Sequence, residues 1–323
     1  MFHFIVNPAS RSGKGIEVWN RVLDYLNESG TEYDVSFSKA QGEVEKLVET
    51  FCREHADSKQ IENLVILGGD GTLNEALQGI TDFSKINLGY IPTGSSNDFA
   101  RSFGYSDDII EVTKRVLSGN EPKIIDLGKL EYEEISDEHS RIQVGDVKKE
   151  RYFDVSCGVG FDAAICEKAL DPGGAKAFLN KIGLGKLIYL KIALAEIFKG
   201  SCPNATLILD DGQKIEINKL RFVVGMNTCY EGGGYKFAPD AVPDDGYLDI
   251  CQVNDIGSLK AFTVLPKASK GNHVSSKQVH IYHTRSFELI CDEPMWVHTD
   301  GEVYTKAKRI KVYCMPKLLR LLY

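Results

Sequence analysis

Three features that mark large protein classes are missing from this chain of 323 residues. No apolar run approaches the roughly 20 residues that span a bilayer, so we expect any membrane contact to be peripheral. Basic residues are not in excess, since 38 Lys and Arg stand against 46 Asp and Glu, a net charge of −8. Nucleic-acid binding depends on neutralising phosphates, and we therefore expect no nucleic acid as the main partner.

Closely paired cysteines are also missing. The eight cysteines are scattered without any C-x-x-C pair, a pattern that disfavours a zinc site. The first apolar run begins at Phe2, and we expect no signal peptide before it. We expect reduced, mostly buried thiols and a cytoplasmic location. The length of the chain predicts two domains.

The first third of the chain alternates between strand-like and helix-like segments. The expected strands are Phe2–Val6, Tyr33–Phe37, Leu64–Leu67 and Asn87–Ile91, and the expected helices are Ile16–Asn27, Val44–Cys52 and Leu73–Ile80. Such alternation predicts a doubly wound parallel α/β sheet that binds its ligands at the carboxyl ends of the strands. The glycine-rich loops of this region lie at that edge.

From about Lys123 onward, strand-like segments predict an antiparallel β-sandwich or barrel. We expect an α/β domain over residues 1–122 and a β-sandwich domain over 123–315. A C-terminal tail at 316–323 either ends in the second domain or returns to the first. One long helix is expected at Phe178–Lys199, with an apolar stripe flanked by lysines. It either lies on an anionic membrane or packs on its own sheet with its lysines in solvent.

The strand at Leu64–Leu67 runs into Gly68-Gly69-Asp70-Gly71-Thr72-Leu73-Asn74-Glu75, which opens a helix. The glycines leave backbone N–H groups uncovered and the helix adds its positive end, so the loop predicts a phosphate site. A carboxylate, Asp70, is useful among phosphates if Mg²⁺ or a substrate hydroxyl lies between them. A plain strand–turn–helix connection that needs glycine is the alternative.

Two further loops at the same edge suit phosphate chemistry. Asn7-Pro8-Ala9-Ser10-Arg11-Ser12-Gly13-Lys14-Gly15 offers hydroxyls, two cations and a helix N-terminus, which suit a nucleotide triphosphate, although it is not a Walker A loop. The segment from Pro92 to Arg101 supplies a second acid, Asp98, and a cation, Arg101. A capped helix is the other interpretation of that segment.

Late in the chain, His298-Thr299-Asp300-Gly301-Glu302 places two carboxylates around a turn. The Asp-Gly pair is also an ordinary hairpin signal. A glutamate beside a phosphate-binding cleft can take a proton from an attacking hydroxyl, an effect worth ~10²–10⁴ in rate. Gly158–Ala163 imitates a dinucleotide fingerprint, but it lies outside any βαβ unit, and we expect no NAD site there.

Taken together, these blocks resemble the diacylglycerol kinase catalytic-domain family, in particular the soluble bacterial lipid kinases and their sphingosine kinase relatives. The resemblance covers nearly the whole chain. The blocks that match in order are Asn7-Pro8, Gly68–Glu75, Pro92–Arg101, Gly158–Ala163, Gly232–Pro239, Asp244–Asp249 and Asp300–Glu302. The Gly-Gly-Asp-Gly-Thr block alone is shared with NAD kinases and phosphofructokinases, whereas the ordered set is specific.

The resemblance implies an ATP cleft between an N-terminal nucleotide-binding α/β domain and a C-terminal β-sandwich that takes the lipid. The residues implied around ATP are Asn7, Pro8, Ala9, Ser10, Arg11, Ser38, Gly68, Gly69, Gly71, Thr72, Asn74 and Thr93. The implied catalytic acids are Asp70, Asp98 and Glu302, with Glu302 as the base that activates the lipid hydroxyl. Further phosphate or substrate contacts are Lys14, Arg101 and Asp126. Asp245 matches a structural Mg²⁺ ligand, aided by the carbonyls of Val242 and Tyr247.

Three positions depart from the family pattern without removing a catalytic group. Arg11 stands where the family usually has glycine, and Ser38 and Ser95 replace threonines. We therefore predict an active ATP- and Mg²⁺-dependent kinase that phosphorylates a diacylglycerol-like lipid at a membrane surface, giving phosphatidic acid and ADP. The alternatives are a soluble-metabolite kinase of the NAD kinase type and a catalytically silent lipid or nucleotide sensor. A homodimer stays open, as does the identity of the lipid.

Overall fold

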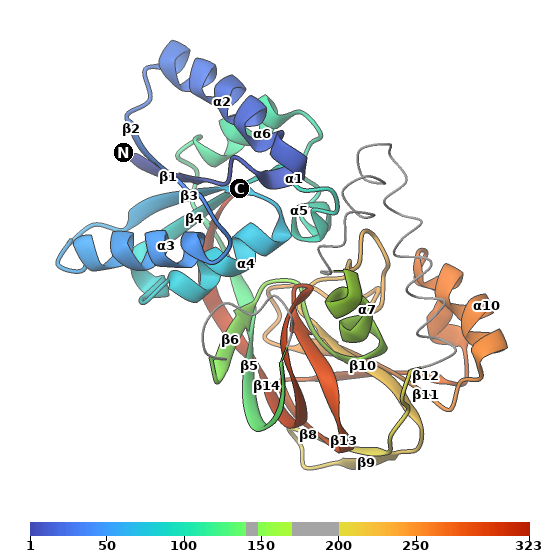
Figure 1. Ribbon diagram of the computed structural model, residues 1–323. Helices are drawn as coiled ribbons and strands as arrows, with labels where there is room; N and C mark the ends of the chain where they lie inside the picture. The colour runs from blue at the N-terminus through green and yellow to red at the C-terminus, as the bar shows by residue number, and fades with distance from the viewer. Residues whose placement is uncertain (140–147, 170–199) are drawn as a thin grey trace.

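The computed structural model describes residues 1–139, 148–169 and 200–323; the helix expected at Phe178–Lys199 lies outside these ranges. Figure 1 shows two halves, the first with helices on both faces of a sheet and the second dominated by strands, and both termini lie in the first half. None of the described helices combines the length and the apolar composition needed to cross a bilayer. All eight cysteines fall within the described ranges, and none of them forms a disulfide.

The first half is a parallel sheet with the strand order β4-β3-β1-β2. Its strands are β1 (Phe2–Val6), β2 (Tyr33–Phe37), β3 (Glu62–Gly68) and β4 (Ile86–Pro92). Its helices are α1 (Ser10–Gly13), α2 (Gly15–Ser29), α3 (Glu43–Glu54), α4 (Asp70–Gly79), α5 (Asp98–Ser102) and α6 (Ile109–Val116), with a 3-10 turn, η1 (Phe83–Lys85). The predicted doubly wound α/β fold is confirmed.

Neighbouring residues of each parallel strand face opposite layers. Ile5 and Ile66 pack in one core with α3 and α4, whereas Phe4 and Val65 pack in another with α2 and α6. Because side chains alternate along a strand, covering both faces requires nearly continuous apolar runs. Polar groups that bind a ligand are then left to the loops at the strand ends.

The second half is antiparallel, as predicted. Its strands are β5 (Lys123–His139), β6 (Glu150–Phe153), β7 (Ser156–Gly160), β8 (Ala205–Leu209), β9 (Lys214–Ile217), β10 (Leu220–Met226), β11 (Leu248–Asn254), β12 (Val279–Thr284), β13 (Ser286–Thr299) and β14 (Glu302–Leu322). Its described helices are α7 (Phe161–Ala169), α10 (Ser258–Ala268) and the 3-10 turn η2 (Asn272–Ser275). Residues from β7, β8, β10, β11, β13 and β14 share one buried apolar core.

Strand β14 joins the two halves. It pairs antiparallel with β13 and β5, and its last residues, Arg320 to Leu322, run parallel to β4. One hydrogen-bonded sheet therefore extends from the α/β half into the antiparallel half. Glu302, the first residue of β14, belongs to the same framework as the loops of the parallel sheet.

Candidate active site

Three loops at the carboxyl edge of the parallel sheet are hydrogen-bonded to one another. Nδ2 of Asn7 donates to Oγ1 of Thr72 at 2.9 Å, and the hydroxyls of Ser10 and Thr93 are 2.7 Å apart. The backbone N–H of Thr93 donates to the carbonyl of Gly68 at 2.7 Å. The loops after β1, β3 and β4 thus form one rim beside the N-terminus of α4, where backbone N–H groups and the helix dipole favour a phosphate.

The late hairpin turn reaches this rim. A Cβ on Gly71 would stand 2.5 Å from Oε1 of Glu302, so a glycine in this first turn of α4 lets the carboxylate approach the helix. Gly71 directly follows Asp70, the first residue of α4. The structure therefore brings together two of the acids that the sequence proposed as catalytic, although they come from opposite ends of the chain.

Asp70 and Asp98 lie in a poorly solvated, acidic environment. Burial, together with the charges of Asp98 and Asp300, raises the pKa of Asp70 from 3.8 to about 7. Burial also raises the pKa of Asp98, which is 5% exposed. Among the described residues, Oδ1 of Asp70 is buried and has no hydrogen-bond partner. Such an oxygen is costly to bury, and a divalent cation shared with phosphates fits it.

Asp98 also ties the second half to the rim. Its Oδ2 accepts a hydrogen bond from the backbone N–H of Gly233 at 2.7 Å, and its Oδ1 lies 3.9 Å from Nε of Arg101. Both contacts lower the pKa of Asp98 and so oppose the effect of burial. Gly233, in the segment between β10 and β11, has a φ of +83°, which favours glycine. Asp98 therefore holds this segment against the start of α5.

The turn that carries Glu302 is fixed by Asp300. The Asp300 carboxylate accepts hydrogen bonds from Nδ2 of Asn74 at 2.8 Å and from the backbone N–H groups of residues 154–156 at 2.9 to 3.1 Å. Arg151 in turn donates to Oδ1 of Asn74 at 2.8 Å. Asn74 thus connects the helix after the glycine loop to the hairpin turn.

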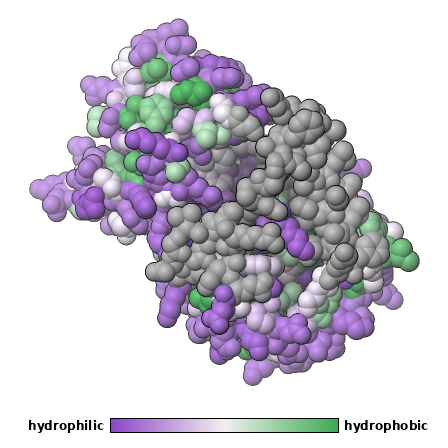
Figure 2. Space-filling view, in the orientation of Figure 1, coloured by the Kyte–Doolittle hydropathy of each residue, from purple (hydrophilic) through white to green (hydrophobic). Residues whose placement is uncertain are grey.

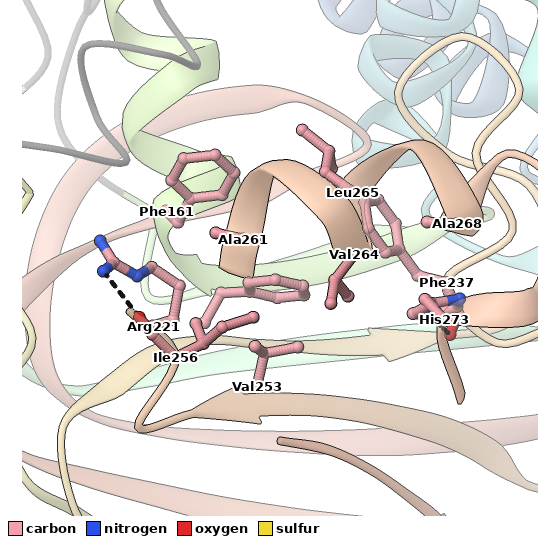
Figure 3. Close-up of a pocket in the computed structure, with 11 residues that line it drawn as sticks. Phe161, Arg221, Phe237, Val253, Ile256, Ala261, Val264, Leu265, Ala268 and His273 are labelled. Atoms are coloured by element: carbon pink, nitrogen blue, oxygen red, sulfur yellow. Dashed lines mark hydrogen bonds between the residues drawn. The ribbon is translucent and has the colours of Figure 1, made fainter. Parts of the chain in front are cut away.

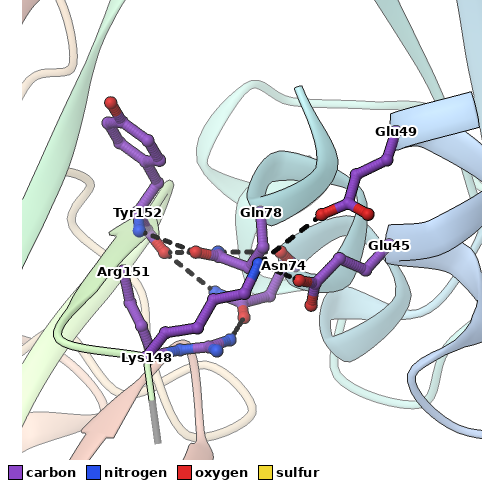
Figure 4. A network of polar contacts seen from close by, with 7 residues as sticks. All are labelled: Glu45, Glu49, Asn74, Gln78, Lys148, Arg151 and Tyr152. Atoms are coloured by element: carbon purple, nitrogen blue, oxygen red, sulfur yellow. Dashed lines mark hydrogen bonds and ion pairs between the residues drawn. The ribbon is translucent and has the colours of Figure 1, made fainter. Parts of the chain in front are cut away.

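Figure 4 shows the polar junction around Asn74, where β6 meets α4. Gln78 donates to the carbonyl of Tyr152 and accepts from its backbone N–H, both at 2.9 Å. Lys148, just before β6, forms ion pairs with two glutamates of α3. These contacts fix the position of β6, and with it Arg151, against the α/β half.

A buried histidine to which the sequence assigned no role supports the same turn. Nδ1 of His298 accepts a hydrogen bond from the N–H of Gly301 at 3.1 Å. Its Nε2 lies 3.0 Å from Asp162 and 3.2 Å from Glu231. A Cβ on Gly158 would collide with both His298 and Asp162. Gly158, the first glycine of the segment that imitates a dinucleotide fingerprint, therefore makes room for this cluster.

The cluster of Asp162, Glu231 and His298 has the residue types of a metal site, but its hydrogen bonding does not fit one. Because Nδ1 of His298 accepts from Gly301, the single hydrogen of the ring lies on Nε2, where it faces the two carboxylates. A metal ligand needs a lone pair at that atom. The cluster therefore orients the turn.

The remaining phosphate-loop residues differ in exposure. Ser38 is 5% exposed, and its backbone N–H donates to the carbonyl of Val6 at 3.0 Å. Arg11 and Lys14 are exposed at the start of the first helices. Arg11 has a φ of +50°, a left-handed conformation that favours glycine. This geometry explains the glycine that the family resemblance leads us to expect at this position.

Asp126 anchors a turn in the second half. It is fully buried, and its two oxygens accept hydrogen bonds from the N–H of Gly246 at 2.6 Å and of Lys317 at 2.7 Å. These bonds fix the turn before β11 against the end of β14. The sequence indicated no such role, and a contact of Asp126 with the transferred phosphoryl group stays a prediction.

The predicted Mg²⁺ ligand, Asp245, lies in that same turn. Its Oδ1 accepts a hydrogen bond from the N–H of Tyr247 at 2.9 Å, and its Oδ2 is 4.0 Å from Nε2 of His283. The proposed donors are the Asp245 carboxylate and the carbonyls of Val242 and Tyr247, all oxygens, as Mg²⁺ prefers. The residues fit a cation that would stabilise the turn, and this site also stays a prediction.

An apolar pocket beneath α10 was not predicted. Figure 3 shows Val264 and Ala268 of α10 above Val253, with Phe161 at one side. Arg221 stands at one end and donates to the carbonyl of residue 256 at 3.4 Å. Phe161 directly precedes Asp162 of the histidine cluster, so the pocket borders the elements that support the turn before Glu302.

Comparison with known proteins covers almost the whole chain. Residues 1–130 match the family model described as the diacylglycerol kinase catalytic domain, and residues 158–323 match the YegS C-terminal NAD kinase beta sandwich-like domain. The "Putative lipid kinase YtlR" of Bacillus subtilis is 26% identical over 93% of this chain and 92% of its own length. A diacylglycerol kinase of Staphylococcus carnosus is 27% identical over 92% of this chain and 87% of its own.

A solved structure has the same fold. The crystal structure of a "putative diacylglycerol kinase" from Bacillus anthracis aligns with a TM-score of 0.75 at 22% identity. The alignment covers 100% of this chain and 94% of that one. The two-domain arrangement is therefore shared from end to end.

Proposed function

This chain belongs to the diacylglycerol kinase family and is a diacylglycerol kinase-like lipid kinase, and from that premise we propose its reaction. It transfers the γ-phosphoryl group of ATP to the hydroxyl of a diacylglycerol-like lipid, giving ADP and a phosphatidic acid. The observation that carries the proposal is the position of Glu302, whose carboxylate lies against Gly71 in the first turn of α4, next to Asp70.

The rim formed by the loops after β1, β3 and β4 binds the triphosphate. The N–H groups at the start of α4 and the exposed cations Arg11 and Lys14 suit its charge. Asp70 and Asp98 would hold Mg²⁺, which neutralises charge on the phosphates when it is bound. The high pKa of Asp70 fits this role, because a nearby cation would favour the ionised carboxylate.

Glu302 acts as the general base. It takes the proton of the lipid hydroxyl while the hydroxyl oxygen forms a bond to the γ-phosphorus. The bond from that phosphorus to the bridging oxygen breaks, and ADP leaves with the electron pair. Asp300 and His298 keep Glu302 in place from two sides of the turn. Positioning of this kind is the main requirement of phosphoryl transfer.

The lipid's acyl part is assigned to the second half, in the pocket beneath α10. Aromatic and aliphatic side chains line it, and such surfaces bind hydrocarbon through the hydrophobic effect.

The reaction is tested with purified protein, Mg²⁺ and labelled ATP against diacylglycerol, a sphingoid base, a polyprenol, phosphatidylglycerol and NAD. We expect label in the diacylglycerol product and none in NAD. Label in NAD alone would establish the soluble-metabolite kinase instead. Nucleotide binding without turnover of any lipid would establish a sensor.

A further inference from the structure

The helix that roofs the apolar pocket also has an unusual outer surface. From Ile256 to Phe287 the sequence contains no Asp or Glu, although the whole chain has 46 acidic residues and a net charge of −8. The same stretch exposes four lysines, Lys260, Lys267, Lys270 and Lys277. The protein is acidic overall, and this stretch gives it a local basic surface.

Two of these lysines, Lys260 and Lys267, lie on α10, on a face next to the one that covers the pocket, and Lys270 follows the end of the helix. Ala261, Val264 and Ala268 are buried toward the pocket, and a helical period places Lys260 and Lys267 on another face. Beside them, Leu259 is 82% exposed, the largest exposed fraction of any large apolar side chain in the described residues. Figure 2 shows hydrophobic surface next to hydrophilic surface at the edge where Figure 1 places α10.

An exposed leucine flanked by lysines is the pattern of an interfacial helix. Two aspartates of the described residues lie near this stretch. Asp255 precedes the helix and pairs with Lys219 at 3.1 Å, and Asp240 is exposed beside Pro239, which packs near Gly271. We propose that the outer face of α10, with Leu259 and the lysines at 260, 267 and 270, docks on the surface of an anionic lipid bilayer.

Docking in this orientation serves the reaction, and to that extent the inference rests on the proposed function. The pocket lies under α10, so docking through this helix brings the pocket close to the bilayer that supplies the lipid. The overall negative charge repels the rest of the protein from an anionic surface, which selects this face. For Phe178–Lys199, which lies outside the described residues, the sequence leaves a membrane contact as one of two alternatives; the present surface is a different one.

Vesicle sedimentation tests the surface. Wild-type protein should sediment with phosphatidylglycerol-containing vesicles at low salt, and much less with phosphatidylcholine vesicles or at high salt. Combined substitution Lys260→Gln, Lys267→Gln and Lys270→Gln should weaken binding about tenfold or more, and Leu259→Asn should weaken it severalfold. The matched controls Lys46→Gln with Lys59→Gln and Lys214→Gln, and Ile61→Asn, alter exposed residues elsewhere and should bind as wild type.

Activity separates this inference from the proposed reaction. The lysine variant should phosphorylate diacylglycerol embedded in anionic vesicles about tenfold more slowly, yet keep wild-type turnover of a short-chain diacylglycerol dispersed in water. Equal vesicle binding by the lysine variant and the wild type would overturn the docking surface. So would Leu259-dependent dimerisation in size-exclusion chromatography without vesicle binding. Vesicle binding through α10 without turnover of any lipid would leave the docking surface standing and refute the proposed reaction.

Discussion

The amide of Asn74 donates a 2.8 Å hydrogen bond to the carboxylate of Asp300 across 226 positions of sequence. One residue lies in the helix that follows the glycine loop, and the other lies in the hairpin turn that leads to Glu302. This side-chain contact forms only in the folded protein. It sets where the phosphate loop lies relative to the proposed base. Its removal should affect catalysis before it affects binding.

Asp300→Asn should lower both activity and stability. The substitution replaces one of the two acceptor oxygens with an NH₂ group, which opposes either Asn74 and the N–H of residue 154 or the N–H groups of residues 155 and 156. We expect the free energy of unfolding to fall by about 1–3 kcal/mol and kcat to fall roughly 10- to 100-fold. Urea unfolding and steady-state kinetics check the two effects; wild-type values for both would show that the turn is held by other contacts.

Gly71→Ala should lower activity without lowering stability. The added Cβ would stand 2.5 Å from Oε1 of Glu302 and push the carboxylate aside. Alanine within a helix is favoured over glycine by about 0.5–1 kcal/mol, so the melting temperature should not drop while kcat falls. Gly257→Ala, where no atom lies within 4 Å of the new Cβ, is the matched control and should keep wild-type turnover. Unchanged kcat in the Gly71 variant would place Glu302 elsewhere during catalysis.

The nucleotide-free protein should become less stable relative to Asp70→Asn as the pH rises. The folded pKa of Asp70 is about 7 and its ordinary value is 3.8, so between these values the folded state holds a proton that the unfolded state has lost. Stability therefore declines with rising pH across this window, and asparagine removes that decline. Melting temperatures from pH 4 to pH 8 measure the effect. A constant difference between the two proteins across that range would contradict a raised pKa.

Arg11 has a strained backbone conformation and also offers a positive charge to ATP. Two variants separate the effect of the strain from the effect of the charge. Arg11→Ala removes the cation and keeps a Cβ at a φ of +50°, whereas Arg11→Gly removes both. We expect the glycine variant to be more stable than the alanine variant by roughly 1 kcal/mol. Both should bind ATP more weakly than the wild type because the exposed cation is lost. Equal stability of the two variants would show that the loop relaxes without strain.

The sequence predicted those parts of the site whose residues lie close together along the chain. Gly68–Glu75 and Pro92–Arg101 each follow a parallel strand, and parallel strands bring such loops to one edge of the sheet. The family and the two-domain fold predicted from the ordered blocks are confirmed. The ATP dependence, the Mg²⁺ site at Asp245, the homodimer and the cytoplasmic location stay predictions.

The contacts that support the site join segments far apart in the sequence, and they could not be predicted from residues that are close together along the chain. His298 reaches Asp162 because β13 pairs with β7 in a register that sets His298 opposite Gly158. Arg151 reaches Asn74 only after β6 packs against α4. Registers and packing of this kind depend on the whole fold. In the sequence, the histidine cluster is marked by Gly158, in the segment that imitates a dinucleotide motif.

The role of Glu302 as the base is the central claim, and Glu302→Gln tests it most directly. The variant's kcat for diacylglycerol and its dissociation constant for ATP should be measured together, with Glu121→Gln, an exposed change outside the site, as the control. We predict a ~10²–10⁴-fold loss of kcat with an ATP dissociation constant within about twofold of the wild type. Undiminished turnover of the lipid by Glu302→Gln would contradict the account.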